Sequence, residues 1–293
     1  MRYAYYPGCS LEAAAVGYDR SLRAVFRRLD LELNELDDWN CCGATAYMSV
    51  AETTALALSA RNLALAERHG GDLVAPCSAC YLVLQKTHRT LAEQPELRAR
   101  VREALGTADL AYEGRVRVRH PLDVLVNDVG LEAIAAKVER PLAGARVASY
   151  YGCQMVRPER GFDDRENPQW LDRLMARLGA EAVDFPLKVR CCGGMLMTTA
   201  PDVGRRLCGD LLVAALDAGA NVVATTCPLC QINLEAYQSA IGRELGRKVA
   251  IPIVFFTQLL GLALGADPGE LGLDLGLVPF GETLAPLMEA AHV

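Results

Sequence analysis

The sequence predicts an α/β fold of two pseudo-symmetric lobes, each built on a small, mainly parallel sheet flanked by helices. Three observations support this prediction. One cysteine pattern occurs twice, the second half repeats the first at an offset of 150 residues over its central part, and short β-prone runs alternate with helical patterns. We expect the first lobe to span residues 1–140 and the second to span residues 141–293, including a C-terminal tail.

Each half is expected to begin with a strand that runs into a cysteine motif. The strand-like runs cover residues 3–6 and 147–151; the first is followed by Pro-Gly-Cys and the second by Gly-Cys. Further along, apolar residues recur at three- and four-residue steps over residues 51–69 and 201–218, and each run stops at glycine. These two segments are therefore predicted to be helices with glycine near their C-terminal ends.

The second part of each half continues with a β-prone run that ends at a C-x2-C step, at residues 72–77 and 222–227. Residues 118–130 and 253–265 then each predict a strand that enters an amphipathic helix. The first half also inserts a polar helix near residues 95–105. Strands that alternate with helices favour a parallel sheet with right-handed crossovers.

Composition excludes several classes of protein. The 293 residues are 52% hydrophobic, and 30 Lys+Arg against 36 Asp+Glu give a net charge of −6 without a long run of one sign, so no nucleic-acid footprint is visible. The longest apolar stretch, residues 251–266, is interrupted by Pro252, Thr257 and Gln258 and is shorter than the ~20 residues that span a bilayer. Residues 1–10 contain no leader pattern. We expect a cytoplasmic protein that partner subunits can hold at the inner membrane face.

Ten of the eleven cysteines form two copies of one pattern, C-x31-CC-x34-C-x2-C and C-x37-CC-x34-C-x2-C. The ten are Cys9, Cys41, Cys42, Cys77, Cys80, Cys153, Cys191, Cys192, Cys227 and Cys230. Thiolates are the ligands of soft metals and iron–sulfur clusters, whereas disulfide frameworks are typical of exported chains. Four of the ten follow strand-like runs, and the carboxyl ends of parallel strands share one edge, where ligands usually bind. We therefore expect these stretches to converge there.

Five thiols per copy exceed the four that a [4Fe–4S] cubane or a structural zinc requires. Either one cysteine stays free beside a cubane, or a different cluster uses all five, or one copy binds zinc. Adjacent cysteines at a strand-to-helix turn can bind different irons of one cluster, and amides at a helix start can stabilise its negative charge. The glycines that follow, Gly43 and Gly193, either let the backbone approach sulfide or are ordinary turn glycines.

The quoted spacing occurs together with the motifs YYPGC, DWNCCGA, APCSACY, CCGG, CPLCQ and QLLGLALG. Over nearly its whole length the chain thus resembles the B subunit of heterodisulfide reductase and its relatives with paired cysteine-rich CCG domains. This resemblance implies that the five cysteines of each copy hold a noncubane [4Fe–4S] cluster, and that two clusters face a cavity between the lobes. It also implies cleavage or formation of a disulfide-like bond, with each sulfur bound by an iron of one cluster.

Three functions follow from these observations. The first is a redox subunit that performs two-electron disulfide–thiol chemistry on a small-molecule disulfide or thiol. The second is an electron-transfer or anchoring subunit of a succinate dehydrogenase or fumarate reductase-like complex, and the third is a zinc-bound structural adaptor. Since no GxGxxG fingerprint and no ferredoxin-type cysteine run occurs, electrons have to pass through other subunits. We expect a ferredoxin-like iron–sulfur subunit and a flavoprotein subunit as partners.

Several further residues have two interpretations each. Cys208, the eleventh cysteine, is expected to be a small core residue. His120 follows a strand expected over residues 115–119 and breaks the repeat symmetry, and it is either a proton donor near a departing thiolate or a structural histidine. Arg157 and Arg160 either attract an anionic thiol or only solvate their loop, and Trp39 either shields a cluster or belongs to the core.

Overall fold

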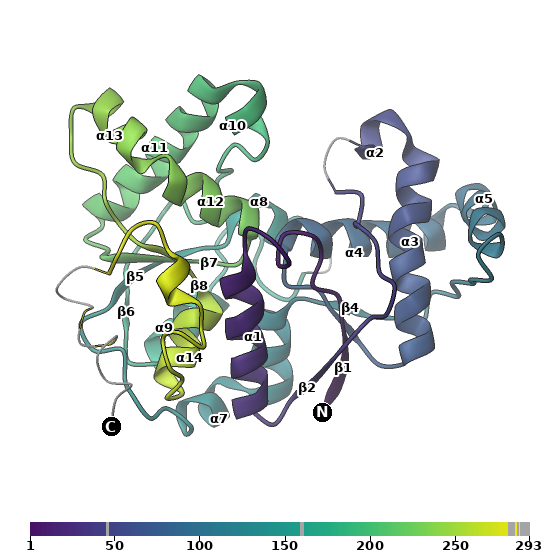
Figure 1. Ribbon diagram of the computed structural model, residues 1–293, viewed down its shortest axis with the longest axis horizontal. Coiled ribbons are helices and arrows are strands. Elements are labelled where there is room, and N and C mark those ends of the chain that lie inside the picture. Colours follow the sequence, from purple (N-terminus) through teal and green to yellow (C-terminus); the bar gives the residue numbers. More distant parts are fainter. Residues whose placement is uncertain (45–46, 159–160, 281–284, 286, 288–293) are drawn as a thin grey trace.

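The computed structural model of the chain describes residues 1–44, 47–158, 161–280, 285 and 287, and it contains two four-stranded sheets (Figure 1). The strands of the first sheet lie in the order β2-β1-β3-β4, those of the second in the order β6-β5-β7-β8, and all neighbours pair in parallel. Counted from the first strand of its own half, each sheet has the strand order 2-1-3-4. The predicted fold class, an α/β protein of two similar lobes, is confirmed.

The first sheet comes entirely from the first half of the chain. Its strands are β1 (Arg2–Tyr5), β2 (Glu32–Glu35), β3 (Leu73–Val74) and β4 (Val118–Arg119). The helices of this half are α1 (Val16–Arg28), α2 (Tyr47–Val50), α3 (Glu52–His69), α4 (Ser78–Glu93), α5 (Pro95–Gly106), α6 (Pro121–Val124), the π-helical turn η1 (Leu125–Val129) and α7 (Leu131–Ala135).

The second sheet is built in the same way from the second half. Its strands are β5 (Arg146–Tyr150), β6 (Glu181–Ala182), β7 (Val222–Thr225) and β8 (Ile253–Phe255). The helices of this half are α8 (Gly152–Met155), α9 (Trp170–Arg177), α10 (Leu196–Thr199), α11 (Pro201–Asp217), α12 (Pro228–Ala236), α13 (Gln238–Leu245), α14 (Phe256–Ala263) and the 3₁₀ turn η2 (Leu273–Leu275).

The predicted elements are present with small shifts at their ends. The helix expected over residues 51–69 is α3, which ends at Gly70 with a backbone φ of 75°, a value that glycine adopts readily. The helix expected over residues 201–218 is α11. The strand expected to start at Arg115 is correct only for its last two residues, because only Val118 and Arg119 pair with β3.

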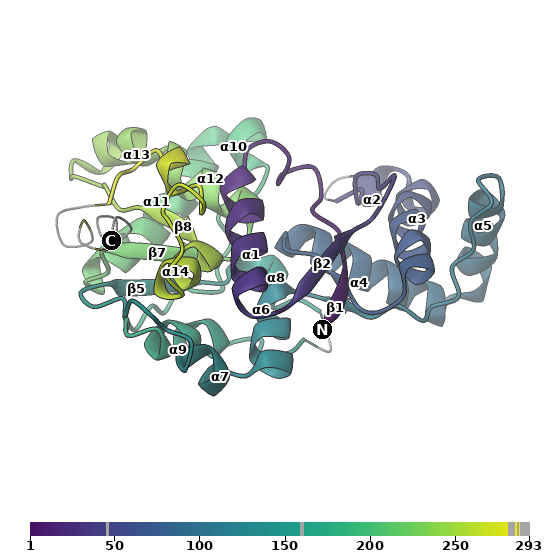
Figure 2. The ribbon, with the colours of Figure 1, turned by 60° about the horizontal axis from the view of Figure 1, so that its bottom comes forward.

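The halves pack on each other through helices rather than through their sheets. Helix α1 of the first half lies against α14 of the second half, between the two sheets (Figures 1 and 2). The ring of Tyr18 stacks on Phe255 at 4.3 Å, and the hydroxyls of Ser21 and Thr257 are 2.6 Å apart. Reciprocally, α7 of the first half packs on α9 of the second. One hydrophobic core is therefore shared by both halves.

The shared packing affects how the lobes are delimited. All strands of each sheet fall on the expected side of residue 140, but helices cross over to the opposite half. The division at residues 140 and 141 therefore stays a prediction. No helix in the described part of the chain has the length and apolar character needed to cross a bilayer.

Candidate metal centre

The four cysteines expected at strand ends lie at the carboxyl edges of the two sheets. Cys77 and Cys227 follow β3 and β7, and each immediately precedes a helix, α4 or α12. Cys9 and Cys153 lie four and three residues beyond β1 and β5. These strands are the two central ones of each sheet, so their ends bring distant parts of the chain together.

The CC steps lie in the loops that follow the edge strands β2 and β6, before the short helices α2 and α10. Each loop carries its second cysteine to the C-x2-C step of the same half. The Sγ atoms of Cys42 and Cys80 are 3.2 Å apart, and those of Cys192 and Cys230 are 3.5 Å apart. The two copies of the sequence pattern are thus also two copies of one arrangement in space.

The ten motif cysteines form one continuous row across both halves. Hydrogen bonds between Sγ atoms join Cys42 to Cys80 and Cys192 to Cys230. The other neighbouring thiols along the row shift the pKa of one another, and Cys9 acts electrostatically on Cys41 at one end. From that end the order is Cys41, Cys42, Cys80, Cys77, Cys227, Cys230, Cys192, Cys191 and Cys153. The contact between Cys77 and Cys227 joins the halves at the centre of the row.

Exposure varies along the row. Its six central thiols are buried, whereas Cys9, Cys41 and Cys191 are exposed and Cys153 is partly exposed. All eleven cysteines are free thiols. Metal or substrate chemistry at the centre would therefore be shielded from water, while both ends of the row can be reached from outside.

A buried tyrosine lines the thiols of each half in the same way. The hydroxyl of Tyr6 donates to the carbonyl of Asn40 at 2.9 Å, and that of Tyr150 donates to the carbonyl of Arg190 at 2.7 Å. Asn40 and Arg190 each directly precede a CC step. Burial first, and then the neighbouring thiolates, raise the pKa of both phenols, so each tyrosine stays neutral and holds its loop in place.

Glycine is required at the residue before the first cysteine of each copy. Gly8 and Gly152 have φ values of +73° and +67°. A Cβ at Gly8 would lie 3.2 Å from the Sγ of Cys80, and a Cβ at Gly152 would lie 3.1 Å from the Sγ of Cys230. A side chain at either position would thus intrude on the thiols, so both glycines leave room around sulfur.

Backbone amides donate to the thiols in both halves. The amide of Gly43 donates to Cys41, and the amide of Gly193 donates to Cys191. At the starts of α4 and α12 the second cysteine of each C-x2-C step donates its amide to the first. Such donors favour the thiolate form that binds metal, as expected for the helix starts.

Thiolates are also favoured by the thiols themselves. The hydrogen bond from Cys41, followed by that from Cys80, lowers the pKa of Cys42 to about 4, and the same pairing raises the pKa of Cys41. In the second half the hydrogen bonds from Cys153 and Cys192 lower the pKa of Cys191. Each set therefore holds its protons in common and presents thiolate at neutral pH.

The donor set fits a polynuclear cluster better than a single ion. Over the described residues, no group of three or more His, Cys, Asp or Glu side chains is arranged around one metal position. A row of thiols with neighbours on either side spreads its sulfurs over a longer distance than a tetrahedral zinc site does. Sulfur ligands, amide donors and glycine clearance together suit iron–sulfur chemistry.

His120 lies at the lobe interface, fully buried, at the N-cap of α6. Its Nδ1 accepts the amide of Leu122 at 3.1 Å, and its Nε2 lies 2.9 Å from the carbonyl of Pro76. Burial lowers its pKa to about 4. With both nitrogens engaged and the ring neutral, the geometry favours the structural interpretation of His120 over that of a proton donor.

The remaining predicted residues also have places in the structure. Cys208 is fully buried and donates to the carbonyl of Cys192 at 3.2 Å, as suits a small core residue. The charge of Arg157 acts on Cys153. Arg160 lies outside the described residues. The ring of Trp39 is partly buried and packs edge-on against Tyr6 at 5.4 Å.

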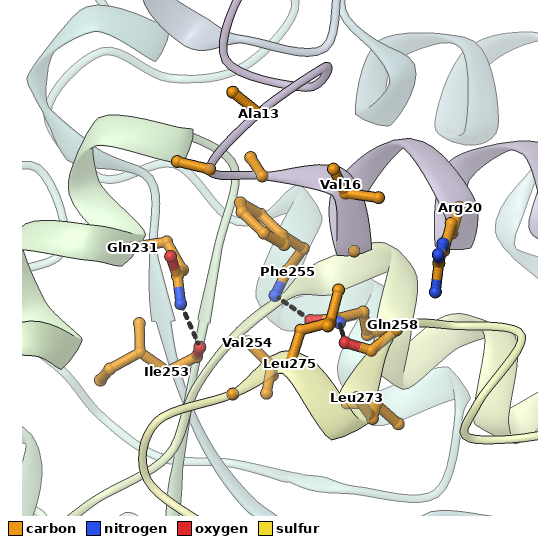
Figure 3. Close-up of a pocket in the computed structure, with 15 residues that line it drawn as sticks. Ala13, Val16, Arg20, Gln231, Ile253, Val254, Phe255, Gln258, Leu273 and Leu275 are labelled. Atoms are coloured by element: carbon orange, nitrogen blue, oxygen red, sulfur yellow. Dashed lines mark hydrogen bonds between the residues drawn. The ribbon is translucent and has the colours of Figure 1, made fainter.

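A cavity of about 400 Å³ lies between the two halves (Figure 3). Its walls come from the loop before α1, from β8 and α14, and from the segment around η2. Arg20 and Gln231 are polar residues on an otherwise mostly apolar wall, and Gln231 directly follows Cys230. None of its 15 lining residues is a motif cysteine, so this is not the predicted cavity between two clusters.

Sequence reasoning missed Ser78, Tyr18 and Asn233. The hydroxyl of Ser78 donates to the carbonyl of Thr226 at 3.0 Å across the lobe interface, and the hydroxyl of Tyr18 reaches the same carbonyl at 3.4 Å. Asn233 contacts Cys192. Ser78 directly follows Cys77 and Tyr18 lies in α1, and neither belongs to a sequence pattern that indicates its role. Asn233 could have been noticed, because the repeat has Val83 at its position.

Comparison with known proteins agrees with this arrangement. The family model described as CCG, cysteine-rich domain, matches residues 3–85 and 147–235. The membrane anchor subunit of 8-methylmenaquinol:fumarate reductase from Wolinella succinogenes is 33% identical over 94% of this chain and 96% of its own. The B subunit of the ferredoxin/F420H2-dependent CoB-CoM heterodisulfide reductase from Methanosarcina acetivorans is 30% identical over 96% and 95%.

Two further proteins extend the comparison. A protein from Archaeoglobus profundus, described as like the B subunit of heterodisulfide reductase, is 31% identical over 99% of both chains. The crystal structure of a hypothetical protein from Helicobacter pylori matches 96% of this chain with a TM-score of 0.80 at 18% identity. The present chain spans 52% of that protein's length, and this likeness concerns the fold.

Proposed function

Since the chain belongs to the family of proteins like the B subunit of heterodisulfide reductase, with two CCG cysteine-rich domains, we propose that it is an iron–sulfur oxidoreductase subunit for two-electron disulfide–thiol chemistry. The observation that carries the proposal is the row of ten thiols, in which two equal sets of five meet at Cys77 and Cys227. Two equivalent redox centres in contact suit a reaction that moves two electrons between two sulfurs.

The ligand assignment follows the two sets of five. The first cluster is held by Cys9, Cys41, Cys42, Cys77 and Cys80, and the second by Cys153, Cys191, Cys192, Cys227 and Cys230. The five thiols of each half follow one another along the row, which supports a noncubane [4Fe–4S] cluster in each set. When bound, these clusters supply electrons one at a time, two of which, with two protons, convert a disulfide into two thiols.

The chain's own residues hold and insulate this centre. Tyr6 and Tyr150 fix the CC loops through hydrogen bonds to the carbonyls of Asn40 and Arg190. The buried Tyr18 lies close enough to Cys77 and Cys227 that the charge of either thiolate raises its pKa. Ser78 ties the start of α4 to Thr226 in the other half, so the two sets cannot separate without breaking buried hydrogen bonds. Water is thereby excluded from the centre of the row.

Partner subunits are part of the proposal. Electrons enter or leave through a ferredoxin-like iron–sulfur subunit and a flavoprotein subunit. This follows because the chain contains neither a ferredoxin-type cysteine run nor a GxGxxG fingerprint for a flavin or nicotinamide. The exposed thiols at the ends of the row support this, since they are the points that a partner can approach. The heterodisulfide reductase relatives are themselves named as subunits.

Metal analysis of the full chain, purified without oxygen, tests the cofactor assignment. We expect about eight irons and eight sulfides per chain, together with reduction of a small-molecule disulfide when reduced carrier protein is supplied. Four irons and one zinc would limit the cluster to one half, and zinc without iron would identify a structural adaptor. A full complement of iron without disulfide turnover would refute the proposed chemistry but not the clusters.

A second candidate function rests on the 33% identity to the anchor subunit of 8-methylmenaquinol:fumarate reductase. In this alternative the same clusters pass electrons within a fumarate reductase-like complex rather than to a disulfide. Purification of the native complex separates the two possibilities. A flavoprotein that reduces fumarate in the complex would favour the alternative, and disulfide turnover without it would favour the first proposal.

A further inference from the structure

Asn233 gives one of the two sets of thiols a side-chain amide donor that the other set lacks. It lies on α12, only 3% exposed, and its Nδ2 donates to the carbonyl of Gly194 at 2.9 Å and to the Sγ of Cys192 at 3.6 Å. The same nitrogen lies 3.4 Å from the carbonyl of Cys192. All three neighbours are acceptors, so the amide nitrogen, and not its oxygen, faces the CC loop.

The equivalent place in the first half is apolar. At the repeat offset of 150 residues, Asn233 corresponds to Val83, which cannot donate to Cys42. The hydroxyl of Tyr150 donates to the carbonyl of Arg190, and that of Tyr6 shares its single proton between the carbonyl of Asn40 and the thiol of Cys42. Neither tyrosine is an amide donor of the kind that Asn233 supplies to Cys192. A backbone amide donates to the second cysteine of the CC step in both halves, so these amides create no difference between the two sets of thiols.

A positive charge adds to the same asymmetry. Arg157 lies four residues after Cys153 and favours the thiolate forms of Cys153 and Cys191. Four residues after Cys9 the chain has Ala13. Since Arg157 is exposed, water and salt screen its effect, and the buried Asn233 is the stronger of the two influences.

Hydrogen bonds to ligand sulfur and nearby positive charge both raise the reduction potential of a thiolate-bound cluster, because the reduced cluster carries more negative charge. We propose that the second half holds the cluster with the higher reduction potential, and that Asn233 is the positioning residue that sets the difference. This inference rests on the proposed function. An electron delivered by the iron–sulfur partner would then settle on the second-half cluster first.

The test is a potentiometric titration of the full chain with intact clusters, followed by electron paramagnetic resonance and visible absorption. The wild-type chain is expected to show two midpoint potentials. Asn233→Val should lower the higher midpoint potential by about 59 mV, which is about a tenfold change in the reduction equilibrium of a one-electron couple. The lower midpoint potential should stay unchanged. The reciprocal change, Val83→Asn, should raise the lower midpoint. Arg157→Gln should act in the same direction as Asn233→Val, but more weakly.

Cys208 provides the matched control. Its thiol donates to the carbonyl of Cys192 but does not touch the sulfur, so Cys208→Ala loosens the same loop without removing the donor to Sγ. We expect its midpoints to match the wild type. An equal shift in Cys208→Ala and Asn233→Val would overturn the inference, because loop position alone would then explain both. So would full iron with unchanged midpoints in both Asn233→Val and Arg157→Gln. A chain without iron would instead overturn the proposed function, and this inference with it.

Discussion

Replacement of Gly8 by alanine tests whether the residue before the first cysteine is there for sulfur or only for the turn. A Cβ at this position would lie 3.2 Å from the Sγ of Cys80, and that sulfur is already 3.2 Å from the Sγ of Cys42. Cys80 cannot retreat without changing the distance between two ligands of the proposed cluster. The backbone φ of +73° adds about 1–2 kcal/mol of strain for any residue with a Cβ.

Gly246 is the control for backbone strain. It caps α13 in the left-handed region, with φ 62° and ψ 23°, and a Cβ there would meet nothing within 4 Å. By urea denaturation of the metal-free chains, Gly246→Ala should therefore lose about 1–2 kcal/mol of unfolding free energy. Gly8→Ala should lose at least as much, because its Cβ also lies 3.2 Å from Cys80 and 3.3 Å from Tyr6. Only Gly8→Ala should also bind less iron and show an altered cluster spectrum.

The outcome that refutes this reasoning is specific. If Gly8→Ala and Gly246→Ala lose equal stability and both keep full iron with wild-type spectra, Gly8 serves the turn alone. The clearance around Cys80 would then have no role in cluster binding. Gly152 allows the experiment to be repeated in the second half, where a Cβ would lie 3.1 Å from the Sγ of Cys230.

Three further predictions follow from the same contacts. Cys42→Ser should change the cluster spectrum and abolish disulfide turnover, while Cys208→Ser should leave both nearly unchanged; turnover that persists after loss of the first cluster would favour a one-cluster relay. Tyr18→Ala should cost about 3–5 kcal/mol in urea unfolding, because its stacked ring fills the lobe interface, whereas Tyr18→Phe should cost under about 1 kcal/mol; equal losses would show that the hydroxyl matters more. His120 has a pKa of about 4 when folded, so the unfolded chain binds the proton first as pH falls. Stability should fall by up to about 3 kcal/mol between pH 6.5 and 4, and His120→Phe should remove that part of the slope; an unchanged slope would mean that His120 does not titrate on unfolding.

Much of the fold could be predicted because the repeat carries it. The offset of 150 residues placed β3 and β7 before their C-x2-C steps, and the alternation of strands and helices indicated parallel sheets. Element ends were less certain, since they depend on which residues find a partner. Arg115 to Arg117 have strand-like neighbours, yet pairing with β3 starts only at Val118, because β3 itself is two residues long.

The site was predictable in its residues but not in its connections. Spacing identified ten ligand candidates, and the strand ends indicated that they meet. The contact of Cys77 with Cys227 depends on how α1 packs on α14, and the contacts that fix this packing join residues as far apart as Ser21 and Thr257. Such pairs show no pattern along the sequence. Nor does sequence alone reveal that His120 has both nitrogens occupied.

The crossed packing of helices makes the two sets of thiols depend on each other. Tyr18 belongs to the first half, but its ring stacks on Phe255 and its hydroxyl reaches Thr226, both in the second half. If the halves moved apart, Cys77 would lose its contact with Cys227, and both would lose the aromatic ring of Tyr18 that lies near them. Both sets of thiols therefore depend on the same interface between α1 and α14. Two separate single-cluster domains would not need this arrangement, whereas a centre that acts on both sulfurs of one disulfide does.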